Sequence, residues 1–144
     1  MKILILHHIE PEYSDFFNEE DYFRHLFNHL SKRAYDRIIL TTLSGIVYPE
    51  LRNVISDEYE WNYYWEDPDD PAYRTWYEEY GYDPADIIPS PTVHQRTYLY
   101  EWIKNLKGHD VTLAGGLREE CLLDFETALT HLGIPFVRLE ECCY

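Results

Sequence analysis

Side chains that can do chemistry follow three apolar runs of this sequence. His7 and His8 come directly after the run at residues 2–6, and polar residues end two further runs. In open parallel sheets, ligands bind outside the carboxyl ends of the strands. If the three runs are parallel strands, their downstream ends share one edge. We therefore predict a small-molecule site there, whose ligand-binding residues would be Thr41, Thr42, Ser44, Gly115, Gly116 and Arg118.

The turn at residues 115–118 leads directly into a predicted helix. Its glycines allow a close backbone approach, the free N–H groups of a helix N-terminus favour an anion, and Arg118 adds positive charge. A small anionic ligand fits this turn. Glu119 and Glu120 would oppose an anion while favouring the helix dipole, so an ordinary helix start is the alternative. Because no Gly-x-Gly-x-x-Gly or Walker pattern is present, we expect no cofactor.

Cys121 lies in the first turns of the same helix, where the dipole can lower the pKa of a thiol. A thiolate facing His7 or His8 would form a nucleophile–base pair, so these three residues are the catalytic candidates. The alternative is that Cys121 is a small buried side chain of the core. Whether the chain is an enzyme stays open.

Cysteine and histidine spacing gives no metal site. The three cysteines form neither an even set nor a Cys-x-x-Cys pair, which indicates reduced thiols rather than disulfides or zinc. Asp21, His25 and His29 share one face of a predicted helix, but a solvated polar face explains that spacing better.

The elements that position these residues alternate between strand and helix. Apolar runs predict strands at 2–7, 37–43, 110–114 and 136–139. Periodicity predicts helices at 16–34, with Asn18 as N-cap, at 91–107 and from about 118 to 132, and a short one at 49–55. We therefore predict a small Rossmann-like or flavodoxin-like α/β three-layer sandwich. About four mostly parallel strands, in the order 2-1-3-4, would have helices on both faces.

The length of 144 residues fits a single domain, 1–144, with one core. The longest apolar stretch is far shorter than the roughly 20 residues that a membrane span needs, and it is too short for a signal peptide. We expect a cytosolic protein that does not enter a membrane.

The net charge is −15, from 12 basic and 27 acidic residues. Such a surface repels phosphates, so we expect no direct nucleic-acid binding. It favours a basic protein partner, which it would steer over long distances. Solubility alone is the alternative reading of the charge.

An acidic insert rich in Tyr and Trp occupies residues 57–91 of the predicted domain. Its first 30 residues hold eleven carboxylates against the single cation Arg74, together with ten aromatic residues. Tyr and Trp dominate the centres of protein interfaces. We predict a partner-binding surface made by Trp61, Tyr64, Trp65, Trp76 and Tyr77. The alternatives are a structural flap over a sheet edge, rings that stack on a nucleobase, and mimicry of nucleic-acid charge.

Residues 111–121, Val-Thr-Leu-Ala-Gly-Gly-Leu-Arg-Glu-Glu-Cys, resemble the isochorismatase-like cysteine hydrolases. In that family a strand ends in Ala-Gly and the cysteine nucleophile follows the glycine by six residues, as Cys121 follows Gly115. The resemblance implies a nucleophilic role for Cys121. The sequence departs from the family at Phe125-Glu126, in place of a Thr-Ala pair, and at His7-His8, in place of a catalytic aspartate.

Residues 115–144 also resemble small uncharacterised α/β proteins of tailed bacteriophages. This resemblance implies an accessory or anti-defence protein in the host cytoplasm. Our leading hypothesis from the sequence is therefore a binding protein that engages a basic protein surface through the insert. The alternative is a small-molecule, nucleotide or Cys-dependent hydrolase site at the strand ends. A homodimer in which the insert covers a sheet edge is a third reading.

Overall fold

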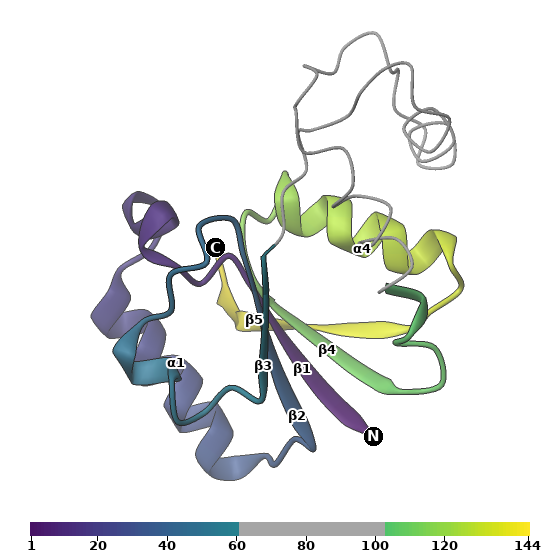
Figure 1. Ribbon diagram of the computed structural model, residues 1–144, viewed down its shortest axis with the longest axis horizontal. Coiled ribbons are helices and arrows are strands. Elements are labelled where there is room, and N and C mark those ends of the chain that lie inside the picture. Colours follow the sequence, from purple (N-terminus) through teal and green to yellow (C-terminus); the bar gives the residue numbers. More distant parts are fainter. Residues whose placement is uncertain (61–102) are drawn as a thin grey trace, which may run out of the picture.

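The computed structural model describes residues 1–60 and 103–144 and contains one sheet of five parallel strands (Figure 1). The order across the sheet is β3-β2-β1-β4-β5, and every neighbouring pair is parallel. The strands are β1 (Lys2–His7), β2 (Arg37–Thr42), β3 (Asp57–Glu60), β4 (Asp110–Gly115) and β5 (Phe136–Cys143).

The four predicted strands are present in the predicted order, and β3 extends the sheet beyond β2. The complete order, 3-2-1-4-5, is that of the first five strands of the Rossmann fold. From β1 the chain adds β2 and β3 on one side of the sheet and then adds β4 and β5 on the other side. This change of side places the switch point at the carboxyl ends of β1 and β4. The predicted insert was assigned as starting at residue 57, but its first four residues form β3 and cover the edge of β2.

Helices lie on both faces of the sheet, as predicted, and make the three layers (Figure 1). Alternate residues of β1 point to opposite faces, so Leu4 and Leu6 join the core beneath α1 (Glu19–Lys32). Ile3 and Ile5 join the core beneath α4 (Cys121–His131). This division explains why the run at 2–6 is continuously apolar: both of its faces are covered.

The start of α1 follows ordinary capping chemistry. The side chain of Asn18 accepts the N–H of Asp21 at 2.9 Å and so caps α1, as predicted. The residues predicted to face inward from the helix at α4 are Leu122, Phe125, Leu129 and Leu132. The first three are buried, and Leu132, just after the helix, is partly buried against the same core.

Besides β3, three elements differ from the prediction. The short helix at 49–55 is a 3-10 turn, η2 (Pro49–Leu51), and a second one, η1 (Pro11–Phe16), was not predicted. Strand β5 runs four residues past the predicted end. The predicted helix at 91–107 falls mostly outside the described residues. Its core positions Ile103 and Leu106, which the structure does describe, are buried.

The predicted partner surface (Trp61, Tyr64, Trp65, Trp76 and Tyr77) lies wholly outside the described residues, so it stays a prediction. In the two described ranges, no helix combines the length and the apolarity that crossing a membrane requires.

Candidate functional site

The carboxyl ends of β1, β2 and β4 bring the predicted site residues to one edge of the sheet. His7 ends β1 and pairs in register with Thr41 of β2 on one side and with Gly115 of β4 on the other. The structure therefore confirms the prediction that His7, Thr41 and Gly115 lie side by side. The residues that follow each strand end form the surroundings of the site.

Polar groups are concentrated in the core at this edge. Across the described residues, the buried polar side chains all lie at or just after the ends of β1 and β2, and each has 0% relative exposure: His7, His8, Glu10, Thr41 and Thr42. Burying a polar or charged group costs free energy unless it is paired. Such a cluster is expensive for a fold and is typical of a site.

Glu10 is the centre of this cluster, and the sequence analysis missed it. Its Oε2 accepts the Nδ1–H of His8 at 2.8 Å and the N–H of Leu43 at 2.8 Å. Its Oε1 accepts both the N–H and the hydroxyl of Ser44, at 2.9 and 2.8 Å. The carboxylate of the loop after β1 therefore holds the loop after β2.

These bonds determine the protonation of the pair. Burial raises the pKa of Glu10, but the hydrogen bonds from His8, Leu43 and Ser44 outweigh burial, and the net pKa is lowered. The ionised carboxylate only accepts hydrogen bonds, so His8 donates its Nδ1–H to Glu10. Carboxylates orient the imidazoles of catalytic and metal-binding histidines in the same way.

His7 contacts Thr41 across the sheet. Its Nδ1 lies 2.6 Å from the Thr41 hydroxyl, and its ring packs edge-on against Phe125 of α4, with 5.1 Å between ring centroids. Burial lowers the pKa of His7 well below its ordinary value, and the neighbouring His8 lowers it further. His7 is therefore neutral at pH 7.

Tyr13 of η1 connects His8 to Cys121. Its ring stacks on His8, with 4.3 Å between centroids, and its hydroxyl lies 3.9 Å from the Sγ of Cys121. Burial raises the pKa of the Cys121 thiol, although the Tyr13 contact opposes this rise. The helix dipole was expected to lower the pKa of Cys121. Burial raises this pKa instead, because Cys121 faces the core. Burial also raises the pKa of Asp124, one turn later on α4, to about 6.

The two glycines of the predicted anion turn, Gly115 and Gly116, lie so close to other residues that neither position has space for a side chain. Gly115 has φ +109°, and a Cβ there would lie 1.9 Å from the carbonyl oxygen of His7. A Cβ on Gly116 would lie 2.3 Å from the ring of Tyr144. Tyr144 donates its hydroxyl to the carbonyl of His8, and it donates its N–H to the carbonyl of Gly115 at 3.0 Å. The glycines thus allow other parts of the protein to approach the backbone, and their role in binding a ligand stays a prediction.

Arg118 is bound to β5. Its guanidinium pairs with the Glu140 carboxylate and donates to the carbonyls of Glu140 and Cys143, at 2.8 and 3.0 Å. These contacts fasten the turn to the last strand. They give Arg118 a structural role, and its prediction as a ligand-binding residue stays untested.

Thr42 and Ser44 shape the loop after β2. The Thr42 hydroxyl accepts the N–H of Gly45 at 3.0 Å.

Over residues 1–60 and 103–144, no group of three or more His, Cys, Asp or Glu side chains is arranged to hold a metal ion.

Glu10, Tyr13 and Tyr144 are the residues of this edge that sequence reasoning missed. Glu10 carried a weak signal: it follows His8 by two residues and directly precedes Pro11. Tyr144 carried none, since its position depends on the length of β5.

Comparisons with protein-family models, with curated proteins and with solved structures give no match to the chain.

Proposed function

We propose that the carboxyl-end edge of the sheet is a small-molecule site with hydrolase chemistry. The observation that carries this proposal is the buried His8–Glu10 pair beside the Tyr13–Cys121 contact. A carboxylate that fixes an imidazole, placed near a thiol, has the composition of a nucleophilic site. The resemblance of residues 111–121 to cysteine hydrolases supports the same role for Cys121.

In this proposal His8 is the general base. The Nδ1–H donates to Glu10, so Nε2 takes the thiol proton while the Cys121 sulfur forms a bond to a substrate carbonyl carbon. The leaving group departs with the proton from His8, and water then hydrolyses the thioester. Because burial keeps the Cys121 thiol protonated at rest, the base is necessary. His7, neutral and held by Thr41, supplies a fixed polar wall.

The test is turnover of small ester, thioester and primary amide probes. Cys121→Ser should lower kcat/KM by at least about 100-fold, and Glu10→Gln by a similar factor, in the range expected when a nucleophile or an oriented base is lost. Cys143→Ser is the matched control, since that thiol lies on β5 outside the cluster and should leave turnover unchanged. Circular dichroism checks that each variant folds. Absence of turnover of every probe by the wild-type protein, or full activity in Cys121→Ser, would remove the hydrolase proposal.

A second proposal is that residues 57–91 bind a basic protein partner. Its support is the charge and ring content of this segment and the exposure of Tyr59 on β3. A pull-down from host extract at rising salt, with the Trp61, Trp65 and Trp76→Ala variant, tests it. Phe16→Ala, at an exposed ring outside the segment, is the control. An interaction that neither salt nor the triple variant weakens would contradict this proposal.

A further inference from the structure

A cavity of about 580 Å³ lies at the opposite edge of the sheet, below the C-terminal end of α1. Its walls come from that helix end, from the loop before β2, from the amino-terminal parts of β1 and β4, and from β5 between Val137 and Glu141. The volume is within the range of small-molecule pockets, roughly 300–1,000 Å³. This cavity shares no residue with the site at the carboxyl ends.

Three cations line the cavity: Lys2, Lys32 and Arg33. Within the described part of the chain, none of them forms an ion pair. The Asp36 carboxylate lies close by, since it accepts the backbone N–H of Lys2 at 2.7 Å, but Asp36 is not among the residues that line the cavity. A molecule with a net charge of −15 therefore gathers positive charge at this place.

Two carboxylates also line the cavity, and they limit its affinity. Glu141 lies 3.7 Å from the Nδ1 of His29. Asp110 is the in-register neighbour of Lys2 on β4. Arg138 lines the cavity as well, but its guanidinium pairs with Glu126 of α4. The three cations, which form no ion pair with the residues that the structure describes, outnumber the two lining carboxylates, so an anion is favoured over a cation.

The rest of the wall suits the body of an organic molecule. Tyr35 bonds through its hydroxyl to the Nε2 of His29 at 2.7 Å, which fixes the ring. Val137 is 63% exposed beside it, an unusual exposure for a valine in a sheet. A small apolar or aromatic group that covers Val137 would gain burial there.

From these contacts we propose that the cavity binds a small organic anion. Its phosphate or carboxylate lies among Lys2, Lys32 and Arg33, and its apolar part lies against Tyr35 and Val137. This site is independent of the proposed hydrolase site, so one can fail while the other holds.

The test is binding of four probes followed by NMR shifts and calorimetry: phenyl phosphate, benzoate, inorganic phosphate and the neutral benzyl alcohol. Phenyl phosphate or benzoate should bind with a dissociation constant in the millimolar range or below and should shift the resonances of Tyr35 and His29. If phenyl phosphate binds more tightly, the cavity prefers a phosphate; if benzoate does, it prefers a carboxylate. Benzyl alcohol should bind at least about tenfold more weakly than either, because it makes no charged contact.

Matched variants separate a site from general charge attraction. Arg33→Gln and Lys32→Gln should each weaken the better anion by about tenfold, and Val137→Asp more than that. Arg24→Gln removes the same charge from the amino-terminal half of α1, at a residue that does not line the cavity, and should change binding less than twofold. The proposal is overturned if neither aryl anion shifts Tyr35 or His29, or if Arg24→Gln weakens binding as much as Arg33→Gln.

Discussion

The Nδ1–H of His8 donates to Oε2 of Glu10 at 2.8 Å, although neither side chain reaches solvent. The same Glu10 carboxylate also accepts the N–H groups of Leu43 and Ser44, so it joins the loop after β1 to the loop after β2. The pair therefore belongs both to the stability of the fold and to the proposed chemistry.

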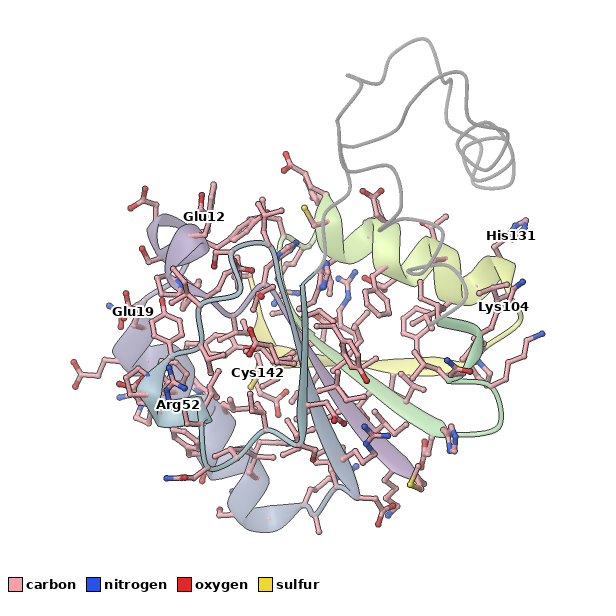
Figure 2. The ribbon with its side chains drawn as sticks, in the orientation of Figure 1. Glu12, Glu19, Arg52, Lys104, His131 and Cys142 are labelled. Atoms are coloured by element: carbon pink, nitrogen blue, oxygen red, sulfur yellow. The ribbon has the colours of Figure 1, made fainter. Side chains whose placement is uncertain are left out.

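Glu10→Gln should destabilise the protein by about 3 kcal/mol at pH 7. The neutral amide offers one acceptor oxygen instead of two and leaves buried N–H donors unpaired. Urea denaturation measures the change. Glu12→Gln, two residues on, is the control; Glu12 points outward at the surface (Figure 2), and its change should stay within about 0.5 kcal/mol. Equal stability of Glu10→Gln and wild type would show that the buried bonds contribute nothing net.

Stability should fall as the pH falls below about 6.5 because of His7. Burial lowers the pKa of His7 in the folded protein, whereas the unfolded chain takes up a proton near 6.5. The unfolded state therefore binds more protons, and its free energy drops relative to the folded state. Between pH 7.5 and 5.5 this one group should cost about 1.4 kcal/mol.

Denaturation at the two pH values, with wild type and His7→Asn, measures this contribution. The asparagine oxygen can replace Nδ1 beside Thr41, and the variant should lose about 1.4 kcal/mol less than wild type over the interval. His25→Asn, on the exposed face of α1, should keep the wild-type dependence. An unchanged pH dependence in His7→Asn would mean that His7 is not the group responsible.

Gly115→Ala should prevent stable folding, whereas Gly108→Ala should cost only about 1 kcal/mol. Both glycines have positive φ, but a Cβ at 115 meets the His7 carbonyl at 1.9 Å and one at 108 meets nothing within 4 Å. The comparison separates steric overlap from backbone strain. Similar melting temperatures for the two variants would contradict the register of β1 and β4.

All three thiols should react slowly at neutral pH. Cys121 and Cys142 are buried, and Figure 2 shows Cys142 inside the molecule between the sheet and α1. Burial raises the pKa of Cys142 to about 12 and that of Cys143 to about 11. Iodoacetamide at pH 7 should modify the folded protein at least about 100-fold more slowly than the protein in urea. Rapid modification of Cys121 alone would indicate a resting thiolate and a nucleophile that needs no base.

The sequence predicted the central strands because each is apolar on both faces, which only a covered parallel sheet explains. It did not predict β3, because Asp-Glu-Tyr-Glu carries three charges and has the composition of a solvated loop. The pairing of β3 with β2 depends on the open edge of the sheet rather than on its own side chains. In β5, residues 140–143 mix exposed glutamates with cysteines, so their alternation was hidden.

The site was predictable as far as strand ends define it. His7, Thr41 and Gly115 meet because register brings them level. Glu10 reaches its place through the positive φ of His8, +57°, a backbone turn that no local pattern indicates. The pKa direction at Cys121 was also hidden, since it depends on burial by distant residues.

The contact between Gly116 and Tyr144 ties together two positions that are far apart in the sequence. In any related chain with this fold, a side chain larger than hydrogen at 116 requires a smaller residue at 144. These two positions should therefore change together during evolution, and Gly116→Ala should be rescued by Tyr144→Leu rather than by a change beside it in the sequence.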